Sequence, residues 1–128
     1  MAMRFLSPEW AEAFKAALNA DPSFREGIAG QRVRIQNVIT DVDGGEVRYW
    51  VRIEDGEVDL GFGDIESPDA TITQTYATAA ALARGELSQV AAFMSGKLKV
   101  SGDLIALMGL AGPFAALPDI MASLDVEY

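Results

Sequence analysis

The chain contains 128 residues, of which 50% are apolar and 23% are charged, a composition typical of one folded domain and not of a disordered segment. Nineteen acidic residues against ten basic ones give a net charge of −9, which argues against a nucleic-acid partner and against docking on anionic membranes. The absence of cysteine and histidine excludes a disulfide framework, a thiolate nucleophile and the commonest metal ligand.

The first predicted element is an amphipathic helix that begins at Ser7 and Pro8, a capping residue followed by a proline at the first helical position. One face of this helix is apolar and largely aromatic, so it must pack on another element. The residues of this face are Trp10, Phe14, Ala17 and Leu18. A short second helical turn is expected after Asp21 and Pro22, before the glycines Gly27 and Gly30.

Beyond Arg32 the apolar residues recur every 2 residues instead of every 3.6, which predicts strands with one apolar and one polar side. Three antiparallel strands are expected over 33–40, 47–54 and 57–62, and a threonine-rich fourth strand over 70–75. The dipeptide Asp55-Gly56 predicts a type I′ hairpin turn, whose two central residues need positive φ. These strands predict a sheet with helices on one face and water on the other.

Trp50 lies on the charged side of the second strand, between Arg48 and Arg52. One interpretation is that Phe5, the N-terminal segment or the long arginine stems cover it. The other is that it contacts a second copy or a partner protein, because exposed tryptophan is a frequent interface anchor.

An alanine-rich helix is predicted from Tyr76 to Arg84, closed by Gly85, and Glu86 is expected to start the next helix. That helix should stop at Gly96, and a fifth strand is expected over 98–101.

Either Ser101 or Asp103 can then cap a helix over 104–111. The tail from Phe114 to Leu124 is predicted to be helical, with an interruption at Pro118. The order of elements therefore predicts an α+β fold, with a five-stranded, mostly antiparallel sheet and helices packed on one face. We expect a single domain over residues 1–128.

The sequence gives little support for a catalytic site or a metal site. Asp41-Val42-Asp43-Gly44 resembles the start of a calcium loop, but the twelfth position is Arg52 where a bidentate glutamate is required. The paired carboxylates lie in turns or on the wet side of the hairpin, whereas acid–base catalysis needs a buried carboxyl group with a raised pKa. We therefore expect no enzyme, no catalytic residue, no metal and no cofactor.

The last third of the chain has more large apolar side chains than one helix face requires. Apolar residues occupy more than one side of 104–111, so this helix is either buried all round in a closed core or forms the wall of a cavity. The methionines here suit an irregular apolar ligand, since their side chains are flexible and polarizable.

The run Phe93-Met94-Ser95-Gly96-Lys97-Leu98-Lys99-Val100-Ser101-Gly102-Asp103-Leu104, with two further apolar residues after it, resembles the C-terminal signature of the sterol carrier protein type 2 (nonspecific lipid-transfer) domain family. This resemblance implies non-catalytic binding and carriage of a sterol, fatty acyl chain, phospholipid or isoprenoid. It also implies a tunnel between the sheet and the C-terminal helices. The implied lining residues are Phe93, Leu104, Leu107, Met108, Phe114, Leu117 and Met121.

The expected partner is thus a lipid or another apolar small molecule, with a homodimer or a partner enzyme as further candidates and no nucleic acid. No signal peptide is recognised, and glycines and prolines divide the apolar tail, so we expect a cytoplasmic protein without stable membrane insertion. The alternative function is an interaction or accessory subunit with a filled core, which docks on a partner through its sheet face.

Overall fold

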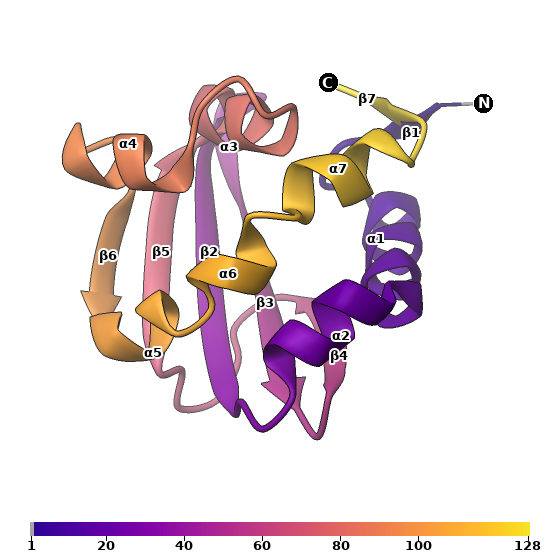
Figure 1. Cartoon of the computed structure of the whole chain (residues 1–128). Helices are drawn as coiled ribbons and strands as arrows, with labels where there is room; N and C mark the ends of the chain where they lie inside the picture. The colour runs from indigo at the N-terminus through magenta and orange to yellow at the C-terminus, as the bar shows by residue number, and fades with distance from the viewer. Residues whose placement is uncertain (1) are drawn as a thin grey trace.

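The computed structural model describes residues 2–128 and contains a five-stranded sheet in the order β4-β3-β2-β5-β6 (Figure 1). Strand β2 lies at its centre, antiparallel to β3 and parallel to β5. The outer pairs, β3 with β4 and β5 with β6, are antiparallel. The strands are β2 (Val33–Val42), β3 (Gly45–Glu54), β4 (Glu57–Phe62), β5 (Ala70–Thr75) and β6 (Lys99–Gly102). The predicted α+β architecture with a mostly antiparallel sheet is therefore confirmed.

Residues 2–128 form seven helices, which lie on one face of the sheet (Figure 1). Capping side chains start most of them: Ser7 Oγ accepts a hydrogen bond from the Trp10 amide at 3.1 Å, and Asp103 Oδ1 accepts one from the Ala106 amide at 3.0 Å. The helices are α1 (Pro8–Ala20), α2 (Pro22–Ile28), α3 (Tyr76–Ala83), α4 (Gln89–Met94), α5 (Leu104–Met108), α6 (Ala111–Phe114) and α7 (Leu117–Ala122).

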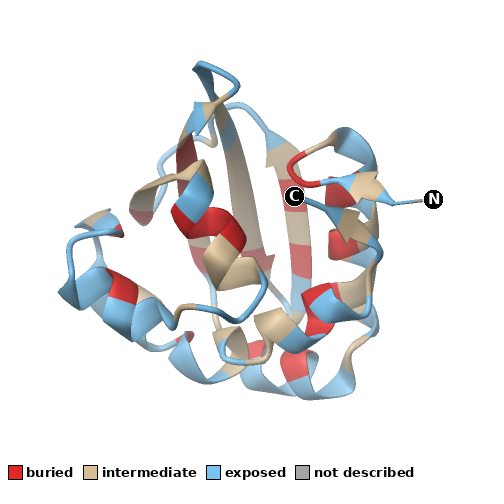
Figure 2. Ribbon diagram, turned by 90° about the horizontal axis from the view of Figure 1, so that it is seen from above, coloured by how far each residue is buried: buried red, intermediate tan, exposed pale blue. Residues whose placement is uncertain are grey.

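The core forms where α1, α2 and the C-terminal helices meet the helix-facing side of the sheet. Trp10 is at its centre, with the Phe5 ring 5.1 Å away at a steep angle and the Phe14 ring stacked at 5.2 Å. Buried positions gather here, whereas α4 and α5 are largely exposed (Figure 2). The largest fully buried side chains are Trp10, Phe24, Ile28, Ile35, Ile39, Ile53 and Leu110.

Two short strands join the ends of the chain and were not predicted. Strand β1 (Met3–Arg4) pairs in parallel with β7 (Val126–Glu127), and the Met3 amide donates to the Asp125 carbonyl at 2.7 Å. Strands of two residues carry no readable period, because alternation needs at least four positions.

Two helix starts also differ from prediction. Helix α4 begins after Ser88, whose hydroxyl accepts a hydrogen bond from the Ala91 amide, and not at Glu86. Pro118 lies in the first turn of α7 and therefore starts a helix, where its missing amide costs nothing, instead of interrupting one.

The outer face of the sheet is partly covered by the loop after β4. Gln36 is buried there, accepting a hydrogen bond from the Ile65 amide at 2.9 Å and donating one to the Gly63 carbonyl at 3.0 Å. The expectation of a wholly wet outer face is wrong at this position, because the loop folds back onto β2.

Candidate functional site

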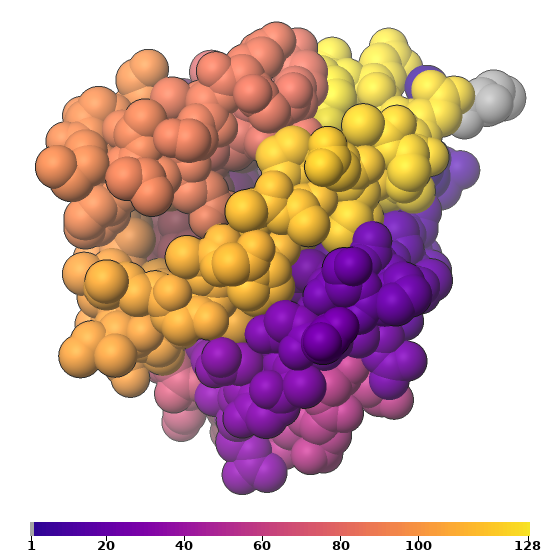
Figure 3. Space-filling view, in the orientation of Figure 1, coloured from indigo at the N-terminus to yellow at the C-terminus, as the bar shows by residue number. Residues whose placement is uncertain are grey.

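A hollow between α4 and the α5–α6 segment opens on the helix-facing side of the sheet (Figure 3). The strands behind it are β5 and β6, where Ile72 and Val100 are directly paired and lie on the face that the helices cover. Both side chains are only half-buried, unlike Ile35 and Ile39 in the neighbouring strand β2. The helices therefore leave this end of the sheet incompletely covered.

Helix α5 is the clearest sign of an unfilled space. It has the sequence Leu-Ile-Ala-Leu-Met, yet none of the five residues Leu104–Met108 is fully buried. An entirely apolar helix is normally enclosed by protein, since each exposed aliphatic side chain forgoes the free energy of burial. Helix α5 thus has apolar surface available for a further apolar molecule.

The structure separates the predicted lining residues into two groups. Those on α4 and α5 belong to the two helices that border the hollow: Phe93, Leu104 and Met108 are 41%, 40% and 67% exposed, and Leu107 is half-buried against the core. Phe114 and Leu117, on α6 and α7, are half-buried and pack on the core.

Met121 lies apart from the hollow. Its side chain is buried, and Trp10 Nε1 donates a hydrogen bond to its sulfur at 3.5 Å. This contact places Met121 in the centre of the core, where it also forms part of the wall of a separate small cleft.

Polar side chains on the helix-facing side of the sheet were missed in the sequence. Asn37 is buried in the apolar row of β2, paired with Tyr49 on one side and with Ile72 on the other. Gln74, which pairs with Ile39, has a buried Oε1 with no hydrogen-bond partner among residues 2–128. A buried acceptor without a partner is costly, because it has lost its hydration without gaining a hydrogen bond in return.

The electrostatics of this face do not favour proton transfer. Burial raises the pKa of Tyr49 to about 12, because the phenolate would lose its hydration. The Tyr49 hydroxyl therefore stays neutral around pH 7 and can act as a hydrogen-bond donor, not as a general base. Among residues 2–128, no three acidic side chains gather closely enough to hold a metal ion.

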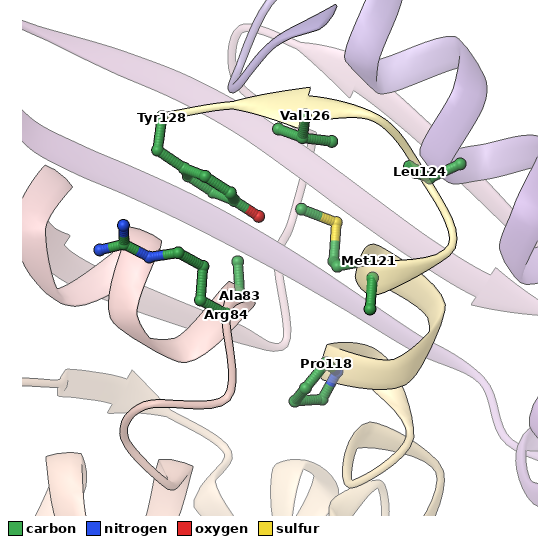
Figure 4. Close-up of a pocket in the computed structure, with 8 residues that line it drawn as sticks. Ala83, Arg84, Pro118, Met121, Leu124, Val126 and Tyr128 are labelled. Carbon is green, nitrogen blue, oxygen red and sulfur yellow. The ribbon is translucent and has the colours of Figure 1, made fainter. Parts of the chain in front are cut away.

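A small cleft between α3, α7 and the C-terminal strand has a volume of about 210 Å³. Arg84 and Tyr128 form one side of it, with the guanidinium carbon 5.1 Å from the ring centroid, and Pro118, Met121 and Leu124 form the other (Figure 4). This volume is below the roughly 300–1,000 Å³ typical of small-molecule pockets, so the cleft alone is too small for an elongated lipid.

A second depression, of about 370 Å³, lies on the surface between α1, α2 and the β3–β4 turn. Arg25 and Glu26 are among its lining residues, and it is open to solvent. Its charged rim does not suit an apolar guest.

Trp50 lies on the outer face of the sheet, away from the hollow. Its ring lies over Gly61, where an added Cβ would come within 2.6 Å of the indole, and Arg52 is 5.9 Å from the ring centroid. The Arg52 guanidinium group therefore covers Trp50 in part, which agrees with the interpretation of cover by an arginine. Cover by Phe5 was a wrong expectation, since the Phe5 ring packs in the core against Trp10. None of the described helices is long and apolar enough to cross a membrane.

The chain is similar to a family model, to a curated protein and to solved structures. A family model described as the SCP-2 sterol transfer family matches residues 12–115. The stomatin-like protein 1 of Mus musculus is 35% identical over 75 residues, which cover 58% of this chain but only 19% of that protein. The chain thus spans about a fifth of the length of this curated relative.

Solved structures are similar over most of the chain. A crystal structure of sterol carrier protein 2 has a TM-score of 0.78 at 20% identity, covering 94% of this chain and 98% of its own. The solution structure of palmitated SCP2L2 from Aedes aegypti has a TM-score of 0.65 at 27% identity, covering 80% and 88%. The five-stranded sheet with its helical cover is therefore a known architecture.

Proposed function

Because the chain belongs to the SCP-2 sterol transfer family, we propose that it binds and carries an elongated apolar molecule, without chemistry, in the hollow between the sheet and helices α4–α7. The observation that supports this most is the exposure of α5, an apolar helix in which no residue is fully buried. At the same end of the sheet, the paired Ile72 and Val100 are also only half-buried. A guest there would cover surface that the protein itself leaves unfilled.

The energetics suit a carrier. A sixteen-carbon chain gains roughly 12 kcal/mol when fully buried, at about 0.8 kcal/mol per methylene. Association costs of about 4–15 kcal/mol leave micromolar or weaker binding, which permits release. A fatty acyl chain is the guest we favour, since one relative with this fold was determined in palmitated form.

Native mass spectrometry of freshly purified protein tests the proposal. We expect adducts of several hundred daltons that disappear after delipidation and return when a fluorescent fatty acid is added. A homogeneous ligand-free mass together with no uptake of the fluorescent fatty acid contradicts carriage.

Gln74 is our candidate for the polar end of the ligand. We expect Gln74→Leu to weaken binding of hexadecanol about tenfold, because its hydroxyl can donate to the Gln74 oxygen and such a hydrogen bond contributes about 1–2 kcal/mol. Ionised palmitate has no donor for this oxygen, so its binding should not weaken. The free energy of unfolding of the ligand-free protein should not fall, since the substitution removes a buried oxygen that has no partner. Competition against a fluorescent fatty acid measures the first effect, and urea unfolding measures the second.

Thr73→Val is the matched control, because Thr73 lies on the opposite face of the same strand. If both variants bind hexadecanol as the wild type does, Gln74 has no part in ligand recognition.

A second role, as an accessory module that presents its ligand to a partner enzyme or docks through the outer face of the sheet, is favoured by one observation. The mouse relative is about five times longer than the matched segment, so a related segment there is part of a larger protein. Trp50, half-buried on the outer face, is the residue we assign to such a contact.

A further inference from the structure

Three polar side chains lie next to one another on the helix-facing side of the sheet, which is otherwise apolar at its paired positions. Asn37 on β2 pairs directly with Tyr49 on β3. Gln74 on β5 pairs with Ile39, two residues along β2, and is therefore a diagonal neighbour of Asn37. None of the paired positions on this side holds a charged residue. We call Asn37, Tyr49 and Gln74 the Asn37 patch.

The polar groups of the patch lack hydrogen-bond partners within the described part of the chain. Asn37 is only 7% exposed, yet its side-chain amide shares no hydrogen bond with another of residues 2–128. The Tyr49 hydroxyl shares none there either, and Gln74 Oε1 is buried without a partner. Enclosed polar groups are nearly always hydrogen-bonded in folded proteins, so three neighbouring exceptions point to a partner from outside the chain.

The patch lies at the inner end of the hollow. Asn37, Ile72 and Val100 form one row across β2, β5 and β6, at strand spacings of about 4.8 Å. Ile72 and Val100 lie behind the hollow, whereas β2 is the central strand and runs behind α6 (Figure 1). A guest whose apolar tail covers Ile72 and Val100 therefore has its other end at Asn37.

The surroundings of the patch offer no cation to an acidic head group. Within their bounds, helices α3–α7 contain neither lysine nor arginine, and their one charged residue is Asp119, which is exposed. Lys15 on α1 is already paired with Asp59, with Nζ 3.3 Å from the carboxylate. A carboxylate at the patch would lose its hydration without gaining a counter-charge. An uncharged polar group loses less and gains hydrogen bonds in return.

We propose that the guest of the hollow has an uncharged head group that both donates and accepts hydrogen bonds, a primary amide or a hydroxyl, which the Asn37 patch binds. This inference rests on the proposed function and adds the chemistry of the ligand's polar end. The Gln74 oxygen accepts from the head group, the Tyr49 hydroxyl donates to it, and the Asn37 amide does both. A primary amide offers two donors and a carbonyl, so it satisfies more of the patch than a hydroxyl does.

Dodecanamide, dodecan-1-ol and dodecanoate test the proposal, because their tails are closely matched and their head groups differ. Each is titrated near neutral pH against a fluorescent fatty acid bound to the delipidated full chain. The amide and the alcohol should bind at least about tenfold more tightly than dodecanoate, since they gain hydrogen bonds and bury no charge.

Two substitutions remove head-group contacts without adding charge. Asn37→Leu should weaken amide binding about tenfold and Tyr49→Phe about fivefold, and neither should change dodecanoate binding by more than about twofold. Tyr76→Phe is the matched control, because it removes the hydroxyl of a tyrosine whose ring packs 5.8 Å from that of Phe5. Urea unfolding verifies that each variant is folded, and Tyr49→Phe carries the comparison if Asn37→Leu is not.

A preference for the amide and the alcohol that these two variants reduce supports the proposal. It is overturned if the variants weaken all three ligands equally, or if dodecanoate binds as tightly as the amide, with its head group at the exposed Lys97 after α4 instead. Binding of all three without preference leaves the proposed carriage in place and refutes the head-group inference. If the wild type binds neither the probe nor any of the three ligands, the proposed function fails, and this inference fails with it.

Discussion

Leu107→Glu should abolish the uptake of a fluorescent fatty acid, weakening binding by at least ~100-fold, because a carboxylate in an apolar site loses several kcal/mol of hydration. Leu107 lies on α5, half-buried against the core and beside the hollow. The substitution therefore places a charge where the guest would meet the helix. Fluorescence titration of the delipidated protein measures the loss.

Two further variants separate a lost site from a lost fold. Leu104→Glu introduces the same charge at a residue that is already 40% exposed, so the protein should fold normally and still bind the fatty acid more weakly. Trp50→Ala, on the outer face of the sheet, should leave uptake unchanged. If Trp50→Ala abolishes uptake while both glutamate variants retain it, the hollow is not the binding site and the outer face is implicated instead.

Gly102→Ala should lower the free energy of unfolding by about 2–5 kcal/mol, through backbone strain and a steric clash together. Gly102 has φ +98°, and a Cβ at this position would lie 2.5 Å from the Asp69 carbonyl oxygen. That oxygen accepts a hydrogen bond from the Asp103 amide at 2.8 Å, and the Asp69 amide donates to the Arg34 carbonyl at 2.8 Å. The obstructing peptide is therefore fixed from two sides and cannot move away. Urea unfolding monitored by tryptophan fluorescence measures the change.

Gly112→Ala is the matched control for this substitution. Gly112 lies in α6, and apart from its two chain neighbours a Cβ there would meet no described atom within 4 Å. Alanine should change the free energy of unfolding by less than about 1 kcal/mol, because its restriction of the unfolded chain is offset by the crowding of Pro113 against a Cβ on the preceding helical residue. Equal effects of the two substitutions would show that the close approach at Gly102 has no energetic weight.

Much of the fold could be predicted because local signals and tertiary structure agree. The alternation over 33–62 marks the three-stranded meander, and the hairpin turn at Asp55 and Gly56 has the positive φ values, 54° and 72°, that the dipeptide predicts. The cap at Asp103 was one of two alternatives, and the structure selects it through its hydrogen bond to Ala106.

The features that were missed depend on contacts between distant segments. Pairing of the two chain ends leaves no periodic pattern in either end, and the loop that covers Gln36 is held by Gln36 itself. Asn37 could have been noticed, since it is the one polar residue in the apolar row formed with Val33, Ile35 and Ile39. Gln74 could also have been noticed, since it continues the side of its threonine-rich strand that carries Ala70 and Ile72.

The candidate site was predictable as a surplus of apolar residues but not as an arrangement. Helical spacing tells which residues share a face, whereas the neighbour of that face depends on how short helices are connected. Leu107 therefore lies half-buried on a helix that borders the hollow, while Met121, chosen by the same reasoning, contacts Trp10 in the core. Their assignment as ligand contacts stays a prediction.

The hydrogen-bonded pairing of β1 with β7 has a practical consequence for engineering. Because Met3–Arg4 and Val126–Glu127 run side by side, a linker or fusion partner attached at either end leaves from one corner of the molecule, remote from α4 and α5 (Figure 1). Immobilisation through either end should therefore orient the protein with α4 and α5 directed away from the support. The adjacent ends also make a circular permutant feasible, with new ends opened at the exposed turn of Gly44 and Gly45.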